Sequence, residues 1–286
     1  MVRSIYDHAC LLLYLNLYIY FFSLFSNLLI TIMREFAKFV KYYQGNLPLI
    51  ISVPHGGMLK VEEIPERKSG IRGIDKNTIE IAIELIEQIK KKYLLLKNNP
   101  KLPSFVFSLV SRKYIDLNRE KSAAFVSTSK LAKEIYQFYH YKLEEYIYYN
   151  LEKFNRSLLI DIHGFESNKR PPGFRDVELI LGTNNLKTLF LEPGPKKEHD
   201  NNVRGKIIKR FNKIGIQIAP GHHLRREYVL TGGFITKKYG VTYIKNSQSI
   251  QIEFSDKIRI HDKELRNRVL FNLAEIITHE LEKDFS

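Results

Sequence analysis

Hydrophobic and polar positions along the chain follow two alternating patterns. Short apolar runs rich in β-branched residues are typical of buried strands, whereas longer stretches with apolar residues every three or four positions are typical of helices. The short runs predict strands at 49–53, 105–110, 157–162, 177–181, 216–219 and 250–254. The longer stretches predict helices at 78–96, 131–154, 202–214 and 262–283.

Strands and helices that alternate in this way predict an α/β fold. We expect a mixed, mainly parallel central sheet with helices on both faces. No internal repeat and no Pro/Gly/Ser-rich linker divides residues 33–286, so we expect a single domain there. Sheets of this kind bind ligands at the carboxyl ends of their strands. Polar residues that follow the predicted strands are therefore the first candidates for a functional site.

The N-terminal segment 1–32 differs from the rest of the chain. Between His8 and Met33 there is no Asp, Glu, Lys or Arg, and the apolar stretch 9–33 is long enough to span the ~30 Å hydrocarbon core of a membrane as a helix. It is too long for the apolar region of a signal peptide, and no small-x-small cleavage site follows it. Two interpretations stay open. The segment is a membrane anchor, or translation begins at Met33 and the protein is cytoplasmic.

Composition and charge narrow the possible chemistry. The chain of 286 residues is 44% hydrophobic and 27% charged, with a net charge of +14, which excludes a disordered chain. Its single cysteine is Cys10. Disulfides, cysteine-ligated zinc, iron–sulfur clusters and a cysteine nucleophile are thus excluded for residues 33–286. A metal bound there must use histidine and carboxylate ligands.

Two histidines lie at the ends of predicted strands. His55 follows the strand at 49–53 in the sequence PHGG, and His163 follows the strand at 157–162. Imidazole is the commonest metal ligand in proteins. Asp161 lies two residues before His163, so on a strand both side chains point to the same face, where the carboxylate can orient the ring. These positions favour a metal site. For His55 alone, a loop histidine that caps local backbone is the alternative.

Glu253 lies near the end of the apolar strand predicted at 250–254. A lone carboxylate in a buried strand is costly unless it is paired, bound to a metal or functional. We interpret it as a general base and acid beside a metal. A structural ion pair with a lysine or arginine is the alternative.

Two further segments suggest contacts with a substrate. Arg112, Asn118 and Arg119 lie in SRKYIDLNRE, and a guanidinium fork with a neighbouring amide suits a carboxylate. Gly232 and Gly233 interrupt an extended segment, which suggests close approach of a ligand or of backbone. A solvated turn and a plain loop are the respective alternatives. The chain lacks the phosphate-loop, dinucleotide-binding and nucleophile-elbow motifs.

Five segments in this order resemble the N-formylglutamate amidohydrolase family. They are LPLIISVPHGG, SRKYIDLNRE, LLIDIHGF, TGGFITKKYG and IQIEF, and they extend over residues 44–256. The order of histidine, Asn-Arg, histidine and glutamate is also similar to the wider zinc carboxypeptidase and aspartoacylase superfamily. The resemblance implies a phosphorylase/hydrolase-like α/β fold and one catalytic zinc ion per chain.

The resemblance also implies roles for single residues. His55 and His163 would be zinc ligands, and Glu253 would be the general base and acid. Arg112, Asn118 and Arg119 would hold the substrate carboxylate or polarise its carbonyl group. Gly232 and Gly233 would be substrate-binding residues.

The chain departs from the superfamily at the third metal ligand. The superfamily's first ligand motif is HxxE, but Met58 stands three residues after His55. The candidates for a replacement are Glu62, Glu63, Glu66 and Asp75. We favour Asp75, because it directly precedes a predicted helix and because the family resemblance implies an acid near this place.

We therefore expect a zinc-dependent amidohydrolase for a small anionic N-acyl amino acid such as N-formyl-L-glutamate, with no nucleic-acid partner. Two alternatives remain. The charge of +14, with the basic clusters at 90–92 and 204–213, is compatible with a protein that binds nucleic acid or another anion. The missing glutamate of HxxE is compatible with a non-catalytic protein on the same fold.

Overall fold

The computed structural model describes residues 35–169, 176–192, 199–228 and 230–282. The chain divides into two compact units, Met1–Lys38 and Phe39–Ser286. The apolar segment 1–32 and the predicted boundary at Met33 lie outside the described residues. Within the described ranges, no helix is both long enough and apolar enough to cross a membrane.

The second unit is built on a mixed sheet of seven strands. Their order is β1-β3-β2-β4-β7-β5-β6, and β2 pairs in parallel with β3 and β4, as does β4 with β7. Antiparallel pairs join β1 to β3 and β5 to β7. The strands are β1 (Val40–Tyr43), β2 (Leu49–Val53), β3 (Ser104–Ser108), β4 (Ser157–Phe165), β5 (Leu179–Gly182), β6 (Ile218–Ala219) and β7 (Ser247–Ser255).

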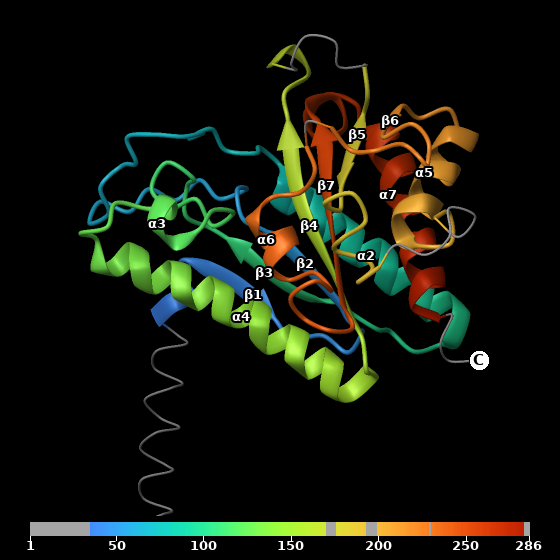
Figure 1. Ribbon diagram of the computed structural model, residues 1–286, viewed down its shortest axis with the longest axis horizontal. Helices are drawn as coiled ribbons and strands as arrows, with labels where there is room; N and C mark the ends of the chain where they lie inside the picture. Colours follow the sequence, from blue (N-terminus) through green and yellow to red (C-terminus); the bar gives the residue numbers. More distant parts are fainter. Residues whose placement is uncertain (1–34, 170–175, 193–198, 229, 283–286) are drawn as a thin grey trace, which may run out of the picture. The chain divides into compact units, whose positions relative to one another are not determined.

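Helices cover both faces of this sheet (Figure 1). One face packs against α2 (Thr78–Lys97), α5 (Val203–Lys213) and α7 (Lys263–Glu282), whose apolar side chains share one core with the strands. The other face lies against α4 (Lys130–Phe154) and the short α6 (Phe234–Lys238). Three short elements complete the described part: α3 (Lys121–Ala124), η1 (Ser167–Lys169) and η3 (Lys257–His261). The predicted α/β fold with a mixed, mainly parallel sheet is confirmed.

Several element boundaries differ from the prediction. The strand at 49–53 is found as predicted, but β7 begins at Ser247 rather than at residue 250. Its first residues are polar and therefore carry no apolar signal. The strand predicted at 105–110 ends at Ser108, and Val110 forms only an isolated bridge with Leu59. The sequence patterns did not indicate β1, α3 or α6, which have only four or five residues each.

The two faces of the central strands carry different chemistry. Along β7, Ser249, Gln251 and Glu253 alternate with apolar residues that belong to the core beneath α2, α5 and α7. Along β4, Asp161 and His163 alternate with apolar residues in the same way. The register pairs Asp161 with Gln251 and His163 with Glu253. Paired residues of neighbouring strands project to the same side, so these four polar side chains form two adjacent rows on the face toward α4 and α6.

A buried histidine of α4 packs against α6. His140 of α4 is 4% exposed, its Nδ1 lies 2.8 Å from the hydroxyl of Tyr239, and its ring packs against Tyr136 and Phe234. Burial, aided by the charge of Lys238, lowers the pKa of His140 to about 3. The ring is therefore neutral at neutral pH.

Protonation of His140 is expected to destabilise the fold in acid. Its pKa of about 3 in the folded protein lies below the unfolded value of about 6.5. The unfolded chain therefore binds more protons between these values, and stability is lost as the pH falls from about 6.5 toward the folded pKa. We expect the free energy of unfolding to fall more steeply with acidification in the wild type than in His140→Asn, by about 1 kcal/mol per pH unit. Urea unfolding from pH 7 to 4.5 measures both slopes, and parallel slopes would contradict this assignment.

Candidate metal centre

Three side chains converge at the carboxyl edge of the sheet. His55 follows β2, His163 lies in the neighbouring β4, and Asp75 precedes α2. The two Nδ1 atoms are 3.1 Å apart, and the Oδ2 atom of Asp75 lies 3.5 Å from Nδ1 of His55 and 3.3 Å from Nδ1 of His163. Among the residues that the structure describes, these three form the one group of His, Cys, Asp and Glu side chains placed closely enough to hold a metal ion. We call His55, Asp75 and His163 the metal group.

The outer nitrogen of each imidazole is held by a buried carboxylate. Nε2 of His55 lies 2.7 Å from Oδ1 of Asp116, and Nε2 of His163 lies 2.9 Å from Oδ2 of Asp161. A carboxylate at Nε2 holds a ring proton there, so Nδ1 is the nitrogen that can exchange its proton for a metal ion. Both rings thus present Nδ1 to the space that they share with Asp75.

The spacing of the three inner atoms suits a tetrahedral metal. Ligand atoms at 2.0–2.1 Å from zinc stand roughly 3.3–3.5 Å apart in a tetrahedron, and the three observed separations run from 3.1 to 3.5 Å. His55, His163 and Asp75 are 1%, 3% and 8% exposed. Two imidazoles and a carboxylate also form a donor set that divalent transition metals bind.

The charges around this group favour a cation. Burial alone would raise the pKa of Asp75, but hydrogen bonds from His163 and His55 outweigh it and hold that pKa well below its usual value. Burial would lower the pKa of His163, but the charge of Asp161 and the hydrogen bonds that His163 donates to Asp161 and Asp75 raise it well above its usual value. The space between these side chains therefore attracts positive charge.

Asp75 is held in place by its backbone as well as by its carboxylate. Its N–H donates to the carbonyl of His55 at 3.0 Å, and its own carbonyl accepts from the hydroxyl of Thr78 in the first turn of α2. Gly164 N–H donates to Oδ2 of Asp75 at 3.2 Å. The other candidates for the third ligand, Glu62, Glu63 and Glu66, are all exposed and belong to no such group.

One buried arginine ties together the chain segments that carry the site. Arg259 is fully buried in the π-helical turn η3. Its guanidinium donates to the backbone carbonyls of Lys76, Phe165 and Phe254. These residues follow Asp75, His163 and Glu253 by one, two and one positions. A Cβ on Gly164 would lie 2.3 Å from Nε of Arg259, so the strand can pass over the guanidinium only as glycine.

Asp116 gathers basic side chains beside the metal group. Arg112 donates to its Oδ2 from Nε at 3.1 Å and approaches it with Nη2 at 3.0 Å. Arg67 and Arg119 lie 3.6 Å from the same oxygen. The charge of His55 and its hydrogen bond, together with Arg112 and Arg67, outweigh burial and lower the pKa of Asp116. Arg112 also reaches toward Asp75, with Nη1 3.8 Å from Oδ1.

Glu253 lies beside the metal group on the neighbouring strand. It is 8% exposed, and burial raises its pKa. Its Oε1 accepts a hydrogen bond from Nε2 of Gln251 at 2.7 Å. The pairing of Glu253 with His163 in the register sets the carboxylate next to the candidate ligands. The sequence alternative of an ion pair is not found for Glu253 among the described residues.

Asn118 and the glycine pair meet one another. The Asn118 amide lies 3.2 Å from Nε2 of His163 through Nδ2 and accepts from the N–H of Ile235 at 2.8 Å. A Cβ on Gly233 would lie 2.1 Å from Nδ2 of Asn118, and Gly232 has a φ of +106°. Glycine at 233 leaves room for the Asn118 side chain, and glycine at 232 allows the left-handed backbone there.

Three residues that contact the site were not among the candidates predicted from sequence: Asp116, Gln251 and Arg67. Asp116 stands within the DLNR segment, and its position before the Asn-Arg pair is a signal that could have found it. Gln251 shares the polar face of β7 with Glu253, which the period of two reveals once the strand is known. Arg67 lies in the loop between β2 and α2, where no pattern distinguishes it from the other basic residues.

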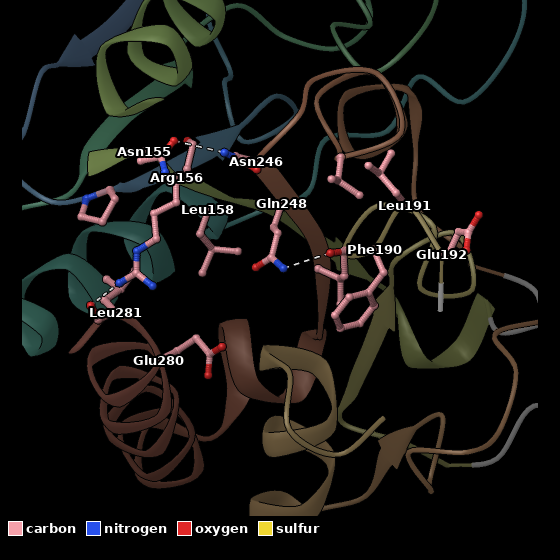
Figure 2. Close-up of a pocket in the computed structure, with 14 residues that line it drawn as sticks. Asn155, Arg156, Leu158, Phe190, Leu191, Glu192, Asn246, Gln248, Glu280 and Leu281 are labelled. Carbon is pink, nitrogen blue, oxygen red and sulfur yellow. Dashed lines mark hydrogen bonds between the residues drawn. The ribbon is translucent and has the colours of Figure 1, made fainter. Parts of the chain in front are cut away.

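A separate pocket of about 570 Å³ lies at the opposite edge of the sheet, where β4 and β7 begin. Figure 2 shows Arg156, Gln248 and Glu280 among its lining residues. Arg156 donates to the carbonyl of Leu281, Gln248 to that of Leu189, and Glu280 pairs with Lys206. These polar groups serve the protein's own contacts, so this pocket offers no chemistry comparable to the metal group.

Comparison with known proteins identifies the fold. No protein-family profile matches the chain, and no curated protein matches its sequence. An N-formylglutamate amidohydrolase from Ralstonia eutropha JMP134 is similar in structure, with a TM-score of 0.59 at 15% identity over 86% of this chain and 98% of that chain. A gene product from Agrobacterium tumefaciens has a TM-score of 0.50 at 12% identity over 86% and 94%. At such identities the likeness shows the fold, and it confirms the hydrolase-like fold that the sequence resemblance implied.

Proposed function

We propose that this protein is a zinc-dependent amidohydrolase that cleaves the N-acyl amide of a small carboxylate-bearing substrate such as N-formyl-L-glutamate. The observation that carries the proposal is the convergence of Nδ1 of His55, Nδ1 of His163 and Oδ2 of Asp75 within 3.5 Å of one another. Glu253 of β7 lies directly opposite His163 of β4 in the strand register. The sequence resemblance supports the substrate class.

His55, His163 and Asp75 would hold the metal. Three protein ligands drawn from histidine and carboxylate are typical of catalytic zinc sites. When bound, zinc polarises the carbonyl group of the amide and lowers the pKa of water. Asp116 and Asp161 keep both imidazoles oriented for this role through Nε2.

Glu253 is the general base and acid in this proposal. It takes a proton from the attacking water and returns it to the nitrogen of the leaving amine. Burial raises the pKa of Glu253, which makes the carboxylate a stronger base than an exposed glutamate. Arg112 is fixed by Asp116 and reaches toward Asp75, so its guanidinium is placed to stabilise negative charge on the carbonyl oxygen.

Arg119 is the residue that we assign to the substrate carboxylate. Its side chain is 49% exposed, and its nearest acidic partner is Asp116, 3.6 Å from Nε. The guanidinium therefore keeps donors for a second carboxylate. The amide oxygen of Asn118 accepts from the N–H of Ile235, and its Nδ2 lies 3.2 Å from Nε2 of His163. Asn118, Gly232 and Gly233 in this proposal shape the substrate side of the site and support His163.

Replacing Arg119 is expected to weaken substrate binding more than catalysis. Arg119→Gln removes a charge-assisted, bidentate contact, and we expect KM to rise about 10- to 100-fold while kcat changes little. Steady-state kinetics with N-formyl-L-glutamate measures the effect. Lys121→Gln, an exposed basic residue two positions along the chain, is the matched control and should leave KM unchanged. An unchanged KM in Arg119→Gln would place the substrate carboxylate elsewhere.

A metal assay combined with a substrate panel tests the proposed function. The purified protein should contain about one zinc per chain, and a chelator should remove both metal and activity. Hydrolysis of N-formyl and N-acetyl derivatives of glutamate, glutamine and alanine would define the acyl group and the need for a side-chain carboxylate. Metal binding without hydrolysis of any member would favour a non-catalytic protein on this fold.

The basic charge of the chain supports an anion-binding alternative less well than the sequence suggests. In α5, Arg204 pairs with Glu227, Lys206 with Glu280, Lys209 with Asp200 and Arg210 with Glu275. Arg204 is also buried. Positive side chains with acidic partners lend little potential to a nucleic-acid surface. Salt-dependent binding of DNA by the metal-free protein, without amide hydrolysis, would reverse this preference.

A further inference from the structure

A single glutamine side chain connects Glu253 to the glycine loop before α6. The N–H of Gly233 donates to Oε1 of Gln251 at 2.6 Å, and Nε2 of Gln251 donates to Oε1 of Glu253 at 2.7 Å. Gln251 is 4% exposed and lies two residues before Glu253 on the same face of β7.

These contacts determine the orientation of the glutamine amide. A backbone N–H can only donate, so the oxygen of the Gln251 amide must face Gly233. Its NH₂ group must then face Glu253, where it donates to Oε1 whether or not the carboxyl group is protonated. A reversed amide would lose both hydrogen bonds at once and leave buried polar atoms without partners.

The contact leaves one oxygen of Glu253 for chemistry. Among the described residues, no hydrogen bond to Oε2 of Glu253 is formed, whereas Oε1 is held by Gln251. The loop that anchors Gln251 is itself fixed, because Ile235 N–H donates to Asn118 and Asn118 contacts His163. The glutamine therefore ties the orientation of Glu253 to the same loop that supports a candidate metal ligand.

We propose that Gln251 is the positioning residue of the general base: it holds Oε1 of Glu253 so that Oε2 is the oxygen that exchanges protons with water and substrate. This inference rests on the proposed function, because it assigns Gln251 a role only if Glu253 is the base. Gln251 acts through Glu253 and itself touches no reacting atom.

The test uses Gln251→Met in the full-length, metal-loaded protein. Methionine has a similar length and no donor for Glu253 or acceptor for Gly233. We expect kcat for N-formyl-L-glutamate to fall of the order of 10- to 100-fold, while KM and the metal content stay within about twofold of the wild type. Gln251→Leu provides a second variant if the first does not fold.

Ser249→Ala separates positioning of the base from general anchoring of α6. Ser249 lies on the same face of β7, one pair of residues earlier, and donates to the carbonyl of Thr236 in α6. It makes no contact with Glu253. If Gln251 affects kcat only by hydrogen-bonding β7 to the α6 segment, Ser249→Ala should lower kcat as much as Gln251→Met does. We expect it to leave kcat within about threefold.

A double variant gives a second, independent readout. In the Glu253→Gln background, Gln251→Met should cause no further loss of the residual rate, because a positioning residue has nothing left to position. Multiplicative losses would overturn the inference, as would a Gln251→Met protein with full kcat. A wild-type protein that binds metal but hydrolyses none of the panel would instead overturn the proposed function.

Discussion

Glu253→Gln is expected to bind metal like the wild type and to lose most of its turnover. Glutamine keeps the size of the side chain and an oxygen for the hydrogen bond from Gln251, but it cannot take up a proton from water. General acid–base catalysis contributes about 10²- to 10⁴-fold, so kcat should fall by a factor in that range. Metal content and kcat, measured on the same preparation, check both halves of the expectation.

Glu178→Gln is a suitable control for this experiment. Glu178 is another carboxylate next to β7, where it accepts from the hydroxyl of Ser255 and pairs with Lys257. Its loss should leave turnover within about threefold of the wild type, because its partners are Ser255 and Lys257 and none of the candidate metal ligands. If Glu253→Gln keeps more than about a tenth of the wild-type kcat, Glu253 is not the base.

Asp75→Asn is expected to abolish tight metal binding without unfolding the chain. Asparagine has the same shape and can still accept from the N–H of Gly164, but it removes the negative charge that faces Nδ1 of His55 and of His163. Loss of an orienting outer partner alone costs 10- to 100-fold in metal affinity, so loss of a direct ligand should cost more than about 100-fold. Competition with a chromophoric chelator measures the affinity, and circular dichroism monitors the fold.

The rejected acids near His55 supply the control for Asp75. Glu63 is exposed and belongs to the set from which the sequence left the third ligand open. Glu63→Gln should bind metal with the affinity of the wild type. A large loss in Glu63→Gln with none in Asp75→Asn would mean that the loop 56–74 rearranges to supply the third ligand.

The strands that could be predicted from sequence are those that contain a run rich in apolar residues. The strand at 49–53 has apolar side chains in four of its five positions, and its predicted and observed bounds coincide. The first residues of β7 were not predicted, because they are polar. The short edge strand β1 was not predicted either, because a strand of four residues with two exposed positions does not differ from a loop in composition. Their placement depends on pairing with distant strands.

The residues of the candidate site also differ in how far the sequence reveals them. His55, His163 and Glu253 could be identified because each stands at the end of an apolar run. Asp75 had to be chosen from four acids. The sequence favours Asp75 only by its place before a helix and by the family resemblance. Its position beside His163 depends on the contact between the loop before α2 and the end of β4, which are separated by more than 80 positions in the chain. Gln251, which acts on another side chain, has no local signal of that role, whereas the place of Asp116 before the Asn-Arg pair is a weak one.

Arg259 has a consequence for how the site can move. Its guanidinium binds carbonyls in three separate segments, so releasing any one of them leaves part of a buried cation unsatisfied. The backbone around Lys76, Phe165 and Phe254 should therefore open in one cooperative event rather than by independent fraying. The loops that carry Arg119 and Gly232 are free of this constraint. A substitution at Arg119 should therefore leave these three segments joined at the edge of the sheet where His55, Asp75 and His163 meet.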